Sequence, residues 1–121
     1  MRNRITLTLG AVAATSALVT ATAFAHETVK STSPGKGKTA STSITSASVT
    51  FNAQIRSGSM KVTGPGGKVV SSGKGGRDPR NVKRVKVPLK SGLKAGSYKA
   101  TWSITAGDGH AETGTFTFKL K

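Results

Sequence analysis

The chain has 121 residues, no cysteine and a formal charge of +15, from 19 basic and 4 acidic residues. The lack of cysteine excludes disulfides and thiolate sites for zinc, iron–sulfur clusters or blue copper. A strongly basic protein suits an anionic partner, but the export signal described next argues against nucleic acid. Because the lysines are spread along the chain, we interpret the charge as a solvated surface with a weak attraction to anionic membrane surfaces.

Residues 1–25 have the three parts of a secretory signal peptide. Arg2 and Arg4 supply a positive start, residues 5–18 are apolar or small, and Ala23 and Ala25 form a small-residue cleavage pattern. Cleavage after Ala25 would release residues 26–121 into the periplasm or another extracytoplasmic space. That length suffices for one small domain, and no later apolar run approaches the length of a membrane span.

Short segments that alternate between apolar and polar residues follow the signal, without sustained helical periodicity. Residues 26–32 suit a first edge strand, and residues 38–46 read as a polar connection. Further strands are predicted at 47–51, around Met60 and Val62, and at 84–89. Pro88 must lie at a strand end or edge, because it has no N–H to donate. Residues 71–81, rich in glycine and basic residues, read as a mobile loop.

The two clearest strands lie near the end of the chain. One places Tyr98, Ala100, Trp102 and Ile104 on one face, and the other does the same with Phe116, Phe118 and Leu120. The segment that ends at Tyr98 resembles the tyrosine corner of Greek-key sandwiches, in which the tyrosine hydroxyl forms a hydrogen bond to the backbone a few residues upstream. We therefore predict an all-β Greek-key sandwich or barrel of about seven strands, immunoglobulin-like or cupredoxin-like.

Three residues are candidate metal ligands. His26, as the first mature residue, would offer an α-amine and an imidazole that together chelate one ion, although any residue can follow a cleavage site. Asp108 and His110 lie two apart, so in a strand-like segment they address one point. The ordinary alternative is that Asp-Gly is a common turn pair and the histidine beside it is merely exposed.

Taken together, these residues predict a copper site. The chain has only two histidines, so an amine, two imidazoles and a carboxylate form an N3O donor set without a soft donor. Such a set favours one Cu(II) per chain, which prefers tetragonal N,O coordination and outcompetes zinc. Met60, the one methionine outside the predicted signal, cannot build a thioether site for Cu(I).

The sequence resembles the CopC family of small exported copper-binding domains over essentially all of residues 26–121. The resemblance implies a Cu(II) site of the histidine-brace kind, formed by His26 through its amine and imidazole, Asp108 and His110. It rests on the elements His26, Ser33-Pro34, Gly37, Gly96-Ser97-Tyr98, Trp102, Asp108-Gly109-His110, Gly114, Phe116 and Phe118.

Two departures from the family pattern stand out. Relatives often carry a Glu-Pro pair after the phenylalanine of the second strand, and its acid can support the amino-terminal amine. Here Asn52-Ala53-Gln54 follow Phe51, so that acid is absent, and Glu27 or Glu112 could compensate. Some relatives also carry a methionine-rich Cu(I) site, which has no counterpart here, so the resemblance implies a member that binds only Cu(II).

The leading hypothesis is a monomeric Cu(II) carrier or buffer, with no catalytic step. It would serve copper resistance or homeostasis by sequestering the ion or delivering it to an inner-membrane copper transporter. One alternative is a histidine-brace copper monooxygenase acting on a polysaccharide, which would need an open copper face and a surface rich in aromatic residues. The other is a metal-free immunoglobulin-like interaction module in which both histidines are incidental.

Overall fold

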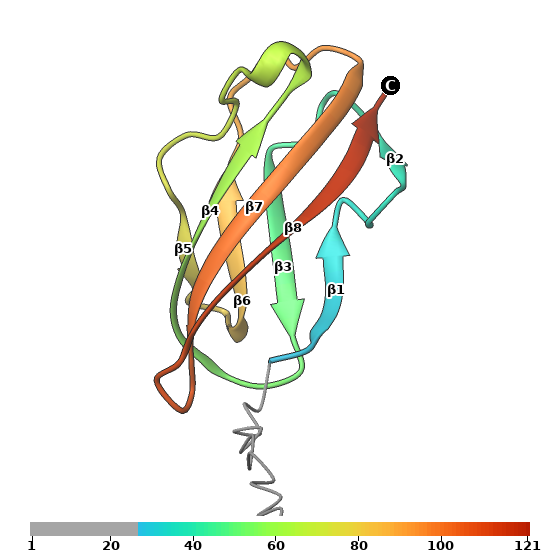
Figure 1. Ribbon diagram of the computed structural model, residues 1–121. Helices are drawn as coiled ribbons and strands as arrows, with labels where there is room; N and C mark the ends of the chain where they lie inside the picture. The colour runs from blue at the N-terminus through green and yellow to red at the C-terminus, as the bar shows by residue number, and fades with distance from the viewer. Residues whose placement is uncertain (1–26) are drawn as a thin grey trace, which may run out of the picture.

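Alternating apolar and polar side chains build the two longest strands of the protein, β7 (Gly96–Ala106) and β8 (Ala111–Leu120). The structure, a computed structural model, describes residues 27–121 (Figure 1). The two strands pair antiparallel over their whole length, from Gly96 opposite Leu120 to Thr105 opposite Ala111. Their predicted inward residues are all buried, namely Tyr98, Ala100, Trp102, Ile104, Phe116, Phe118 and Leu120.

The strands of the described residues form two four-stranded sheets. One sheet has the order β1 (Val29–Ser33), β3 (Ser46–Phe51), β6 (Asn81–Pro88) and β5 (Gly76–Asp78). The other has the order β2 (Thr39–Ala40), β8, β7 and β4 (Ile55–Thr63), and a single 3-10 turn, η1 (Pro65–Gly67), follows β4. Residues 27–121 contain no α-helix. The predicted all-β sandwich is therefore confirmed.

No helix in residues 27–121 is long and apolar enough to cross a membrane.

The core lies between the two sheets and includes a cluster of aromatic rings. Phe51 meets Trp102 edge to face at a centroid distance of 4.9 Å, and Tyr98 stacks on Phe118 at 5.6 Å. The alternation predicted for β3 is confirmed, since Ala47, Val49 and Phe51 are fully buried. Its outward residues are also largely covered, because β1 and β6 flank β3 on both sides.

Two smaller predictions about chain ends are confirmed. The hydroxyl of Tyr98 donates a hydrogen bond to the backbone oxygen of Lys94, which closes the tyrosine corner at the start of β7. Pro88 is the last residue of β6, where its missing N–H costs no ladder hydrogen bond.

Two stretches expected to be irregular contain strands. The predicted mobile loop at 71–81 includes β5, whose Arg77 lies opposite Val85 of β6. Asp78, 8% exposed, ends β5; its Oδ1 accepts the N–H of Arg80, and Oδ2 lies 3.7 Å from an Arg84 guanidinium nitrogen. The predicted polar connection at 38–46 includes β2, which pairs parallel with β8. Both strands are too short for an alternation pattern to show in the sequence.

Three segments that are distant in the sequence meet at one end of the sandwich. Figure 1 shows the β7–β8 turn, the β3–β4 connection and the first described residues at this end, while the C-terminus lies at the opposite end. The pairing of Ile55 with Ala106 places the start of β4 beside the end of β7. Residues 106–112, which include the predicted ligands Asp108 and His110, are therefore close to the amino-terminal end of the domain.

Gly114 makes the packing of the single tryptophan possible. It lies directly opposite Trp102 in the β7–β8 ladder, and a Cβ at this position would overlap the indole ring. We expect Gly114→Ala to lower the free energy of unfolding by about 1–3 kcal/mol, because the ring must shift out of a filled core. Chemical denaturation measures this loss. The control is Thr115→Ser on the exposed face, expected within about 0.5 kcal/mol of the parent; equal losses in the two variants would contradict the packing argument.

Candidate metal centre

The β7–β8 turn is closed by its own backbone. The N–H of Gly109 donates to the oxygen of Ala106 at 2.9 Å, and the N–H of Ala106 donates to the oxygen of His110 at 2.7 Å. Gly109 has a φ of +93°, in the region that glycine adopts without steric cost. The turn that carries Asp108 and His110 is therefore closed by backbone hydrogen bonds.

Asp108 and His110 contact each other directly. Oδ1 of Asp108 accepts the backbone N–H of His110 at 3.0 Å, and Oδ2 lies 2.8 Å from Nδ1 of the imidazole. The backbone hydrogen bond from His110, followed by the one from its ring, lowers the pKa of Asp108 below its ordinary value. Both side chains are about half exposed, at 43% and 51%. The structure thus brings together an ionised carboxylate and an imidazole that a metal ion can reach from solvent.

The contact also orients the imidazole. With Nδ1 bonded to the Asp108 carboxylate, a metal would bind His110 through Nε2, and a carboxylate on the other ring nitrogen raises the basicity of such a ligand. In this arrangement Asp108 acts through the ring. To bind the same ion itself, its carboxylate would have to leave Nδ1, because Nδ1 and Nε2 point away from each other.

These two side chains do not complete a site. Within residues 27–121 no group of three or more histidine, cysteine or acidic residues could hold a metal ion. The remaining predicted donor, His26, lies outside the described residues, as does the predicted signal peptide. Whether the predicted donors can meet at one ion therefore depends on where Glu27, the first described residue, lies relative to the turn.

The chain enters beside the turn. The backbone N–H of Glu27 donates to both carboxylate oxygens of Glu112, each at 3.1 Å. The N–H of Thr28 donates to Oδ1 of Asn52 at 2.9 Å, and the N–H of Asn52 donates back to the oxygen of Thr28 at 2.9 Å. Because Glu112 is two residues beyond His110, the residue that follows His26 lies close to the Asp108–His110 pair.

Arg56 supports the turn from β4. Its Nε donates to the backbone oxygen of Gly107 at 3.0 Å, and its guanidinium lies alongside Gly109. Neither the support from Arg56 nor the contact of Asn52 with the entering chain was predicted from the sequence. Arg56 is one of many basic residues and lies 51 positions from Gly107, and Asn52 looks like an ordinary residue after a strand.

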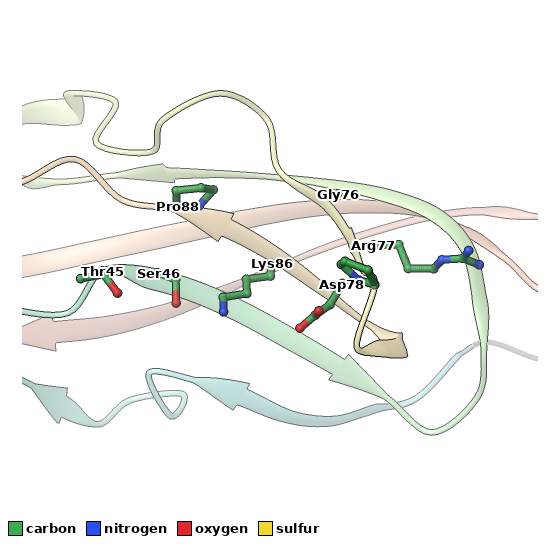
Figure 2. A pocket seen from close by; sticks show the side chains of 8 residues that line it. Thr45, Ser46, Gly76, Arg77, Asp78, Lys86 and Pro88 are labelled. Carbon is green, nitrogen blue, oxygen red and sulfur yellow. The ribbon is translucent and has the colours of Figure 1, made fainter.

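A shallow pocket elsewhere on the surface shows no comparable chemistry. It lies over β3, β5 and β6, and Figure 2 shows Ser46, Lys86 and Asp78 around it, while the Arg77 side chain points away. That guanidinium donates to the backbone oxygen of Ile55 at 3.0 Å, and Asp78 is engaged by Arg80 and Arg84. None of the predicted metal ligands lines this pocket.

Comparison with known proteins identifies the family. The CopC domain profile matches residues 29–121, well over half of the chain. The chain belongs to the CopC family. Two curated relatives, each named Protein YobA, from Escherichia coli (strain K12) and Shigella flexneri, are 28% identical over 109 residues, which is 88% of this chain and of each relative.

Solved CopC structures share the fold. CopC from Methylosinus trichosporium OB3b matches with a TM-score of 0.65 at 19% identity, covering 79% of this chain and 94% of its own. PcoC, a methionine-rich copper resistance protein from Escherichia coli, matches with a TM-score of 0.63 at 25% identity, covering 80% and 100%. Both of these structures are cupredoxin-like β-sandwiches. Of the two sandwich types expected, the cupredoxin-like one is therefore confirmed.

This CopC family member differs from PcoC in its methionine content. Its described residues hold one methionine, Met60 of β4, which is 2% exposed within the core. A thioether cannot reach a surface metal from that position. Residues 27–121 therefore offer nitrogen and oxygen donors only.

Proposed function

We propose that this CopC family member is an exported Cu(II)-binding protein that sequesters copper or delivers it to a membrane copper transporter. The observation that carries the proposal is the Asp108–His110 pair, half exposed on a braced turn beside the entry of the chain at Glu27. Sequestration and delivery both require a site that solvent and a partner can reach, at an end of the domain.

The proposed centre takes one Cu(II) per chain from an N3O donor set. Its members are the α-amine and imidazole of His26, the imidazole of His110 and the carboxylate of Asp108. Cu(II) suits nitrogen and oxygen donors in a tetragonal arrangement and stands at the top of the affinity order for divalent first-row metals. The ionised Asp108 also offsets part of the charge of the ion. Coordination is the whole function in this account, with no bond-making step.

The buried aromatic residues favour a carrier over a polysaccharide-oxidising enzyme. Tyr98 and Trp102 are 3% and 7% exposed, and the other aromatic residues of the described domain, Phe51, Phe116 and Phe118, are buried too. A flat binding surface for a sugar chain would need such rings at the surface. An assay with reductant and oxygen, followed by detection of peroxide or oxidised sugar, is expected to give no turnover above free copper.

The test of the proposal is a competition titration of Cu(II) against pH. Amine and imidazole donors must lose a proton before they bind a metal, and their ordinary pKa values are about 7.7 and about 6.5. We expect one Cu(II) per chain at pH 8 and a steep loss of affinity toward about pH 5, with proton release rising toward about three per copper. Asp108 contributes nothing to this loss, because its lowered pKa keeps the carboxylate ionised over the whole range.

Quenching of Trp102 fluorescence is the readout, because the tryptophan lies on the strand that leads into the turn. A protein that binds no Cu(II) at pH 8 would support the metal-free interaction module instead. A flat pH profile between 8 and 5, with quenching intact, would mean that carboxylates hold the metal without the nitrogen donors.

A further inference from the structure

Glu112 is a polar residue on the core-facing side of β8. It lies opposite Ile104 in the ladder and continues the inward series of Gly114, Phe116 and Phe118. Cross-strand partners share a face of the sheet, so the Glu112 carboxylate points toward the other sheet at the end of the sandwich where the core stops. It is half-buried there.

This carboxylate holds the amino-terminal end of the described domain. Both of its oxygens accept the same backbone N–H of Glu27, at 3.1 Å each, across 85 positions of sequence. A hydrogen bond to an ionised acceptor is roughly twice as strong as a neutral one. The reciprocal contacts of Thr28 with Asn52 fix the next residue to the β3–β4 connection. The entering chain is therefore held from β8 and from the β3–β4 connection at successive residues.

The nitrogen that Glu112 binds is covalently attached to His26. Holding this amide fixes the backbone position from which the predicted ligand residue extends. A metal site that draws donors from a chain terminus and from a turn otherwise has to order the terminus when the ion binds, and that ordering costs affinity. A terminus held in place beforehand avoids this cost.

We propose that Glu112 is a positioning residue of the copper centre, which holds the amino-terminal segment so that His26 reaches the metal bound by His110 and Asp108. The inference rests on the proposed function. Glu112 acts here through the Glu27 amide and not as a metal ligand. Residue 27 contributes only its backbone N–H to this contact, so the contact does not depend on the side chain at position 27.

The experiment compares Glu112→Ala, Glu112→Gln and Glu27→Gln in the processed chain. Glu112→Ala removes the acceptor, while Glu112→Gln keeps a carbonyl oxygen of similar reach. Glu27→Gln is the matched control, because it removes one negative charge from the same contact pair and leaves the acceptor in place. Thermal unfolding without metal verifies that each variant is folded, and the nearly isosteric Glu112→Gln remains informative if Glu112→Ala is not.

Two quantities are measured, the Cu(II) affinity and the hydrogen exchange of the Glu27 amide in the metal-free protein. We expect Glu112→Ala to lower the affinity about 10- to 100-fold, as is typical for residues that orient metal ligands, and to speed exchange at Glu27 by about the same factor. Glu112→Gln is expected to fall between Glu112→Ala and the parent, and Glu27→Gln within about 3-fold of the parent in both quantities.

Three results would overturn the inference. Parent-like copper affinity in both Glu112 variants would show that holding the segment does not matter, while the proposed copper function would still stand. An equal loss in Glu27→Gln would show that the carboxylates act through charge alone. A processed parent chain that binds no Cu(II) would remove the proposed function itself, and the inference with it.

Discussion

A chain that keeps a methionine in front of His26 is expected to bind Cu(II) about 100-fold more weakly, or worse, than the chain that begins at His26. The added residue turns the α-amine into a peptide nitrogen, which destroys the chelate that the amine forms with the imidazole of the same residue. A factor of 100 corresponds to about 2.7 kcal/mol of binding free energy, a modest figure for the loss of one nitrogen donor and its chelate ring.

The comparison needs the two chains to differ only at the amino terminus. The contacts of the Glu27 amide with Glu112 and of Thr28 with Asn52 do not involve the α-amine, so both chains should unfold at the same temperature without metal. Competition with a chelator of known affinity then measures the difference in copper binding. Equal affinities of the two chains would rule out the amine as a ligand.

His110→Ala is expected to have the second large effect, a loss of Cu(II) affinity of about 100-fold or more. The substitution removes one of the proposed nitrogen donors. The turn itself should persist, since it is closed by backbone hydrogen bonds between Ala106, Gly109 and His110 and is supported by Arg56. Thermal stability without metal is therefore expected to change little, which separates loss of a ligand from loss of the fold.

Asp108→Asn is the matched comparison. It keeps an oxygen that can accept the backbone N–H of His110 and removes the negative charge, so we expect a smaller loss, about 10-fold. Electron paramagnetic resonance of the bound copper distinguishes the two roles. An unchanged hyperfine pattern in His110→Ala would exclude His110 as a ligand, and full affinity in Asp108→Asn would exclude any need for the charge.

Much of the fold is predictable from the sequence because its strands are half-buried and long. Alternation along β7 and β8 identifies Trp102 and Phe118 as core residues, and the spacing before Tyr98 identifies its corner. β5 escaped prediction because three residues rich in glycine and charge carry no alternation, and it exists only because β6 offers a partner edge.

The turn residues of the candidate site were predictable, but the contacts that support it were not. Asp108 and His110 lie two apart, so their proximity is local. The contacts that bring the amino-terminal segment to them join Glu27 to Glu112 and Thr28 to Asn52, which are 85 and 24 positions apart. Such pairs depend on which strands become neighbours, and no local pattern encodes that.

The structure also clarifies how this chain departs from the family pattern after Phe51. Asn52 occupies the position after that strand. Its side-chain Oδ1 accepts the backbone N–H of Thr28, and its backbone N–H donates to the backbone oxygen of Thr28. Of the two acids considered as substitutes, Glu112 presents its carboxylate to the amino-terminal segment, and Glu27 takes part through its backbone. Export, the monomeric state, the transporter partner and the weak attraction to anionic membranes stay predictions.

The most direct test of the copper centre is an electron paramagnetic resonance spectrum of the correctly processed chain titrated with Cu(II). We predict a tetragonal spectrum that saturates at one copper per chain and shows coupling to nitrogen donors from His26 and His110. A spectrum with oxygen donors alone, or one that never departs from that of Cu(II) in buffer, would contradict it.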